Sequence, residues 1–79
     1  MQDKEIKINL KKFGKHLANL RKEKDLSINM FAYENDFSKS LISRIERGNS
    51  DIRLSTLLKL SEALDVPSTE LLNFGKEEL

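Results

Sequence analysis

Only two residues, Asn35 and Asp36, separate two short segments in which apolar residues recur at helical spacing. The first segment starts at Ser27 and runs through Phe31 to about Asn35, and the second is the stretch from Phe37 to Gly48. A two-residue break is too short for a flexible loop, and asparagine and aspartate tolerate the left-handed backbone conformation that tight turns use. The sequence therefore predicts two short helices that meet at a fixed corner.

The second of these segments, residues 37–48, carries its apolar and polar residues on different sides of a helix. Ser38 is a suitable N-cap, and Gly48 is a natural residue to follow the last turn. The apolar side is formed by Phe37, Leu41, Ile42 and Ile45. The other side carries Lys39, Ser40, Ser43, Arg44 and Arg47. Arginine and lysine can donate to guanine or to phosphates, so the pattern favours a helix that enters a DNA groove. A plain amphipathic surface helix is the alternative for this segment taken alone.

A longer helix is predicted near the start of the chain, from Asn9 as a plausible cap to about Lys24. Its apolar stripe consists of Leu10, Phe13, Leu17 and Leu20. Gly14 inside it costs up to ~1 kcal/mol relative to alanine, so we expect another helix to pass close to that position. His16, the only histidine, is expected to be half-exposed and has no second ligand with which to share a metal.

Two further helices are predicted after the loop of residues 49–53. Residues 54–64 are apolar around more than half of the helix, which is typical of a central core element. Ser50 or Asp51 is the expected cap of that helix. The last helix is expected to start near Pro67 and to end near Phe74. No strand pattern or internal repeat appears in the sequence.

Size and composition restrict the class of protein. A chain of 79 residues forms one domain, and it buries ~60% of its extended surface. The absence of cysteine excludes disulfides and thiolate metal sites, and no other cluster of metal ligands or cofactor motif is present. No apolar run approaches the roughly 20 residues of a membrane span. We therefore expect a soluble cytoplasmic protein without metal or cofactor.

The net charge of +1 conceals a gradient along the chain. Residues 1–24 hold eight basic and three acidic residues, a balance of +5, whereas residues 25–53 hold four and five, a balance of −1. Residues 54–79 hold two basic and five acidic residues, a balance of −3. The first segment suits a phosphate partner, although a solvated lysine-rich helix is an equally simple interpretation.

Five such helices with this turn resemble the Cro and lambda-type phage repressor family of helix-turn-helix domains, often called the Xre family. The resemblance covers about Phe13 to Phe74. It is carried by Phe13-Gly14, Leu17, Leu20-Arg21, Leu26-Ser27, Phe31-Ala32, Ser38, Ile42 to Gly48, Leu57 to Leu64, Val66 and Glu70 to Leu72. It implies an all-α, compact five-helix DNA-binding domain over residues 9–74, an N-terminal arm over residues 1–8 and a C-terminal tail over residues 75–79.

The resemblance also implies where DNA would lie. In such folds the second helix crosses the sugar-phosphate backbone, and the third places its N-terminal half in the major groove. On that basis the base-reading residues are Lys39, Ser40, Ser43 and Arg44, with Arg44 the first choice for guanine. The phosphate-binding residues are Ser27, Arg47, Asn49 and Arg53. Arg21 and Glu46 match the partly buried ion pair of the family, a structural role.

The family pattern is not matched everywhere. Ile28 stands where glutamine usually reaches a phosphate, and Asp36 replaces the usual glycine of the turn. Met30 and Tyr33, with Ile28, either form an exposed apolar patch or cover the core. Leu41 occupies a position that is usually small and polar, where it either touches a thymine methyl group or fills core.

The function that follows is a sequence-specific transcription regulator of the phage-repressor or restriction-modification controller kind. It would bind double-stranded DNA as a homodimer, on palindromic half-sites about one helical turn, ~34 Å, apart. The last helix would supply the dimer interface through Leu71, Leu72 and Phe74, unless some of these residues close the core. The alternative is a protein-binding module, such as an antitoxin or adaptor. Enzymatic activity is not expected, because no nucleophile and base are paired in the sequence. No small-molecule ligand is expected either.

Overall fold

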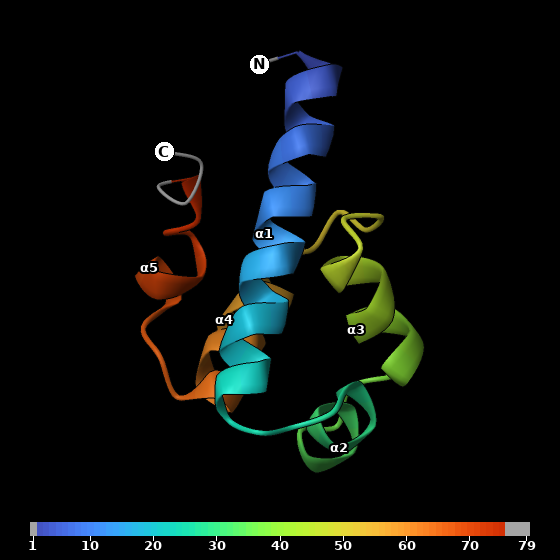
Figure 1. Cartoon of the computed structure of the whole chain (residues 1–79), viewed down its shortest axis with the longest axis vertical. Helices are drawn as coiled ribbons and strands as arrows, with labels where there is room; N and C mark the ends of the chain where they lie inside the picture. Colours follow the sequence, from blue (N-terminus) through green and yellow to red (C-terminus); the bar gives the residue numbers. More distant parts are fainter. Residues whose placement is uncertain (1, 76–79) are drawn as a thin grey trace.

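Five α-helices form the regular structure of residues 2–75, the part of the chain that the computed structural model describes (Figure 1). They are α1 (Asp3–Glu23), α2 (Ile28–Glu34), α3 (Lys39–Glu46), α4 (Leu54–Leu64) and α5 (Ser68–Leu71). No strand occurs within these residues, so the predicted all-α fold is confirmed. Residues 76–79 of the predicted tail lie outside the described residues. None of the helices within 2–75 combines the length and apolar character needed to cross a membrane.

The first helix starts earlier than predicted. α1 begins at Asp3, so Asn9 is not its cap, and the expected arm of residues 1–8 is helical from residue 3 onward. The backbone N–H of Gln2, the N-cap residue, donates to the Glu5 carboxylate at 3.2 Å, so this N–H group has a hydrogen-bond partner. Asp3 and Glu5 also place negative charge near the positive end of the helix dipole. The Asn9 side chain instead donates to the carbonyl oxygen of Glu5 at 2.9 Å.

All five helices contribute to one apolar core. Its fully buried large side chains are Leu17, Phe31, Ile42, Ile45, Leu60, Leu64 and Leu71. α4 is less central than its composition predicts, because Leu54 and Leu58 are exposed. His16 is buried rather than half-exposed, and its Nε2 donates to the carbonyl oxygen of Glu70 at 2.8 Å. This hydrogen bond joins α1 to α5.

Gly14 marks the closest approach of α1 and α3. A Cβ atom added at this glycine would lie 2.5 Å from the carbonyl oxygen of Glu46 and closer still to that of Ile45. Carbon and oxygen atoms in contact are ordinarily separated by about 3.3–3.6 Å. The helix predicted to pass close to Gly14 is therefore α3, and only glycine permits its approach.

Aspartate ends three of the helices in the left-handed conformation. Asp25, Asp36 and Asp65 have φ values of 57°, 59° and 57°, and Gly48 follows α3 with φ 76°. After α3, the N–H groups of Gly48 and Asn49 donate back to the carbonyl oxygens of Ile45 and Arg44 at 3.0 and 2.9 Å. These bonds satisfy carbonyl groups that a helix end leaves free. The predicted stop at Gly48 and the predicted turn at Asp36 are both confirmed.

Candidate nucleic-acid interface

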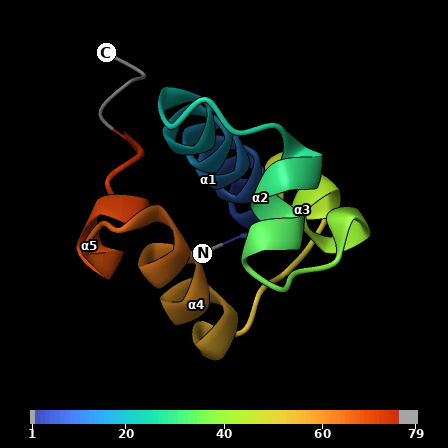
Figure 2. The ribbon, with the colours of Figure 1, turned by 90° about the horizontal axis from the view of Figure 1, so that it is seen from below.

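The predicted corner is formed by α2 and α3, which pack together on the side of α1 opposite to α5 (Figure 2). Each helix is capped by a serine. The Ser27 hydroxyl oxygen accepts from the backbone N–H of Met30 at 3.1 Å, and that of Ser38 accepts from Leu41 at 3.0 Å. Local hydrogen bonds therefore fix the residue at which each helix begins.

The inner side of the corner is closely packed. Phe31 and Ala32 of α2 belong to the same buried cluster as Ile42 and Ile45 of α3, as predicted. The rings of Phe31 and Phe37 also stack with centroids 5.9 Å apart, which covers the turn. Such packing holds α3 rigidly on α2, and a rigid helix is what direct reading of DNA bases needs.

The outer side of α3 faces solvent. Lys39, Ser40 and Arg44 are exposed, and Ser43 is half-buried. At 100° per residue these four positions share one side of the helix, within an arc of about 140°. Leu41, for which a base contact or a core role was left open, is half-buried and packs against the core. The structure therefore brings the four predicted base-reading residues together on an accessible surface.

The predicted phosphate-binding residues flank this surface. Ser27, Arg47, Asn49 and Arg53 are all exposed, Ser27 at the start of α2 and the others in or beside the loop after α3. Arg53 itself occupies the N-cap position of α4, so neither Ser50 nor Asp51 is the cap that was expected. Arg53 makes no side-chain capping bond, and the first N–H groups of α4 remain available to an anion.

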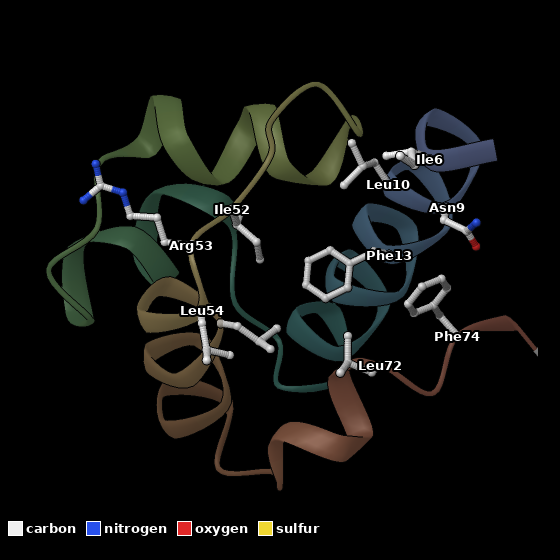
Figure 3. A pocket seen from close by; sticks show the side chains of 10 residues that line it. Ile6, Asn9, Leu10, Phe13, Ile52, Arg53, Leu54, Leu72 and Phe74 are labelled. Carbon is white, nitrogen blue, oxygen red and sulfur yellow. The ribbon is translucent and has the colours of Figure 1, made fainter. Parts of the chain in front are cut away.

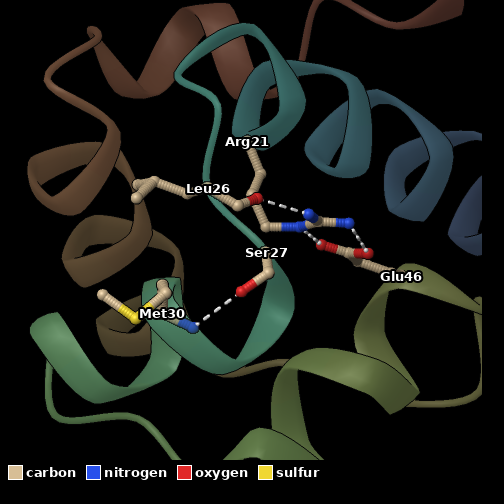
Figure 4. Close-up of polar contacts among 5 residues, drawn as sticks. All are labelled: Arg21, Leu26, Ser27, Met30 and Glu46. Carbon is tan, nitrogen blue, oxygen red and sulfur yellow. Dashed lines mark hydrogen bonds and ion pairs between the residues drawn. The ribbon is translucent and has the colours of Figure 1, made fainter.

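A buried ion pair ties the corner to α1 (Figure 4). Nε of Arg21 donates to Glu46 Oε2 at 2.7 Å, and Nη2 donates to Oε1 at 2.9 Å. Nη1 donates to the carbonyl oxygen of Leu26 at 2.6 Å, in the segment that leads into α2. The hydrogen bond to Glu46 raises the pKa of Arg21, although burial acts in the opposite direction. The pair that was predicted to be structural thus connects α1, the start of α2 and the end of α3.

The predicted dimer residues differ in exposure. Leu71 is fully buried in the protomer core, so of the two roles expected for it the structure shows the one of closing the core. Phe74 is half-buried, with its ring edge against Phe13 at a centroid distance of 6.0 Å. Leu72 is 57% exposed. Of the three residues, only Leu72 presents most of its side chain to a partner.

Leu72 opens onto an apolar groove that the sequence did not indicate (Figure 3). The groove has a volume of about 360 Å³. It is lined by Ile6, Asn9, Leu10, Phe13, Ile52, Arg53, Leu54, Leu57, Leu72 and Phe74. The guanidinium group of Arg53 is directed away from its apolar side chains (Figure 3). The sequence does not predict the groove, because its pattern places Ile6 in an N-terminal arm and Leu54 in the apolar core.

The three apolar residues of α2 that depart from the family pattern differ in exposure. Ile28 is half-buried against the core, so it does not form a patch. Met30 and Tyr33 are exposed, Tyr33 by 85%. α2 therefore carries two accessible apolar side chains beside the proposed DNA surface.

Residues 14–74 match the helix-turn-helix domain family. The chain belongs to this family. A similar protein, the control protein C.MunI of Mycoplasma sp, is 40% identical over 68 residues, which cover 85% of this chain and 92% of C.MunI. The transcriptional repressor RghR of Bacillus subtilis (strain 168) is 39% identical over 59 residues, 73% of this chain and 44% of RghR.

A solved structure agrees with the fold. The restriction-modification controller protein C.AhdI from Aeromonas hydrophila superposes with a TM-score of 0.78 at 37% identity, covering 82% of this chain and 94% of C.AhdI. The predicted all-α fold and the predicted family of helix-turn-helix transcription regulators are therefore confirmed.

Proposed function

We propose that this protein is a dimeric transcription regulator of the restriction-modification controller kind, which binds palindromic operator DNA through α3. The observation that carries the proposal is the exposed polar side of α3, held rigidly by α2 and by the Arg21–Glu46 pair. Similarity over most of C.MunI and C.AhdI supports the controller class. The absence of enzymatic activity and of a small-molecule ligand remains a prediction from the sequence.

Base reading is assigned to Lys39, Ser40, Ser43 and Arg44. Arg44 is the strongest candidate, because a guanidinium group can donate two hydrogen bonds to the N7 and O6 atoms of guanine. Ser27, Arg47, Asn49 and Arg53 would contact phosphates on either side and set the register of α3 in the groove. A bidentate contact of this kind discriminates between bases by about 1–3 kcal/mol, whereas phosphate contacts are indifferent to sequence.

Selection of bound sites from a random DNA pool tests this function. We expect a palindrome whose half-sites are about one helical turn apart. Arg44→Ala should relax the preference at one base position in each half-site and leave folding intact. Arg47→Ala is the matched control, since loss of a phosphate contact should weaken binding to all sequences equally. Equal losses for both variants would remove Arg44 from base reading, and recovery of no enriched sequence would end the regulator proposal.

The dimer interface is proposed to lie at the apolar groove, with Leu72 at its centre. Ile6 and Leu54 are the other exposed apolar residues that line the groove, and burial of such a surface favours association. Leu72→Glu should give monomers in sedimentation and weaken operator binding. Met30→Glu is the control for sedimentation, because Met30 is comparably exposed, at 47%, but lies on α2 and does not line the groove. If Leu72→Glu remains dimeric, the interface lies elsewhere.

The second candidate is a protein-binding module of the antitoxin or adaptor kind. Met30 and Tyr33 favour it, since both offer apolar surface on α2. The two candidates differ in their dependence on salt. DNA binding should weaken with a log-log slope of about −0.9 for each phosphate neutralised. Binding that is insensitive to salt would favour the protein-binding module.

A further inference from the structure

A second hollow lies between α1 and the loop after α3, and it shares Asn49 with the proposed phosphate-binding surface and Leu10 with the apolar groove. It has a volume of about 430 Å³. Its lining consists of Lys7, Leu10 and Lys11 from α1 and Gly48, Asn49, Ser50 and Asp51 from the loop. We call it the α1–loop hollow. The loop following α3 lies beside the N-terminal half of α1 (Figure 1).

Gly48 makes this contact possible. A Cβ atom added at Gly48 would lie 2.7 Å from Cα and 2.9 Å from the backbone nitrogen of Lys11. The backbone of α1 therefore rests directly on the loop, and Lys11 starts from a fixed position beside it. Lys7 precedes Lys11 by four residues, so both side chains leave the same side of the helix.

The charge of the hollow is positive. Lys7 and Lys11 are exposed, and within residues 2–75 neither ammonium group has a carboxylate partner within 4.0 Å. Asp51 is the one carboxylate that lines the hollow, so two ammonium groups face one negative charge. Ammonium groups without such a partner can exchange water for phosphate oxygens, whereas paired ones would first have to be separated.

The hollow is continuous with the proposed phosphate-binding surface. Asn49 belongs to both, and Arg47 immediately precedes Gly48 in the chain. Lys7 and Lys11 lie before residue 14, where the match to the helix-turn-helix family begins. The α1–loop hollow depends on the early start of α1 at Asp3, because an unfolded arm would not hold Lys7 beside the loop.

We propose that Lys7 and Lys11 bind backbone phosphates of the operator next to those held by Arg47 and Asn49. The N-terminal turns of α1 thereby widen the DNA contact of each protomer beyond the helix-turn-helix unit. The inference rests on the proposed function, because it takes duplex DNA in the groove of α3 as given. A lysine ammonium binds phosphate as a point charge and reads no base, so the added affinity is independent of sequence.

The test measures operator affinity against salt concentration for Lys7→Gln, Lys11→Gln and the double variant of the full chain. Each single change removes two contacts from a dimer, so the log-log slope should become shallower by about 1.8. Lys12→Gln is the matched control. It carries the same charge change, but Lys12 is rotated by about 100° from Lys11 and does not line the hollow. Asp51→Asn should act in the opposite direction and tighten binding.

The outcomes separate this inference from the function on which it rests. Shallower slopes for Lys7→Gln and Lys11→Gln, with the same ratio of operator to random-sequence affinity as the wild type, support the inference. If the slopes of Lys7→Gln and Lys11→Gln equal that of Lys12→Gln, the inference is overturned. The proposed function then still stands, provided that the wild type binds the operator. If the wild type itself shows no salt-dependent DNA binding, the proposed function fails. Thermal unfolding of each variant identifies any loss that comes from misfolding.

Discussion

Replacement of Gly14 by alanine distinguishes helix propensity from packing, because the two effects have opposite signs. In an isolated helix, alanine is better than glycine by about 1 kcal/mol. In this protein the new Cβ would lie 2.5 Å from the Glu46 carbonyl oxygen, and nearer still to that of Ile45. Relaxation to an ordinary carbon–oxygen separation of about 3.3 Å requires the end of α3 to move by roughly 0.8 Å.

That movement is opposed by bonds at the same helix end. The carbonyl oxygen of Ile45 accepts from Gly48 at 3.0 Å, and Glu46 is held by two hydrogen bonds from Arg21. Overpacking costs typically 1–3 kcal/mol, backbone shifts included, and because two carbonyl groups must move here we take the upper part of that range, about 2–3 kcal/mol. After the gain in helix propensity is subtracted, we expect Gly14→Ala to lower the free energy of unfolding by about 1–2 kcal/mol.

Thermal unfolding followed by far-UV circular dichroism measures this change. For a domain of this size, each kcal/mol lowers the Tm by roughly 4–8 °C, so a decrease of about 5–15 °C is expected. Lys15→Ala is the control, since Lys15 is the next residue, is exposed and should change stability by less than about 0.5 kcal/mol. A Tm for Gly14→Ala at or above that of the wild type would refute the close approach of α1 and α3.

Three further changes test the bonds around the corner. Glu46→Ala should lower the free energy of unfolding by about 3 kcal/mol or more, because it leaves the buried Arg21 without its carboxylate. In urea titrations, the double variant Arg21→Met, Glu46→Leu should recover most of that loss. A double variant as unstable as the single one would contradict this account. Asp36→Gly should raise the free energy of unfolding by about 0.5–1 kcal/mol, since glycine adopts the left-handed conformation without a Cβ penalty. It should also tighten DNA binding by removing a negative charge. An unchanged or lower urea midpoint would argue against backbone strain at Asp36. Ser38→Ala should cost about 1 kcal/mol through loss of the bond to the Leu41 N–H, and an unchanged midpoint would mean that water replaces the cap without loss.

The sequence by itself determined the corner and the helix ends on which the proposed DNA surface depends. The serine caps at Ser27 and Ser38, the left-handed turn at Asp36 and the stop at Gly48 are all made by hydrogen bonds between residues a few positions apart. Such bonds depend on local residue order, and a spacing of three and four residues places side chains on one side of a helix whatever packs against it. The polar side of α3 was therefore predictable residue by residue.

The tertiary structure decided which apolar residues are covered. Leu71 is the last residue of α5 and Leu72 is its C-cap, yet Leu71 is fully buried and Leu72 is largely exposed. Leu54 of α4 is exposed, whereas Leu60 of the same helix is buried. A leucine carries the same local signal in either environment, and only the positions of the surrounding helices determine whether it meets protein or solvent. The two hollows that α1 forms with α4, α5 and the loop after α3 likewise arise from contacts between residues distant in sequence.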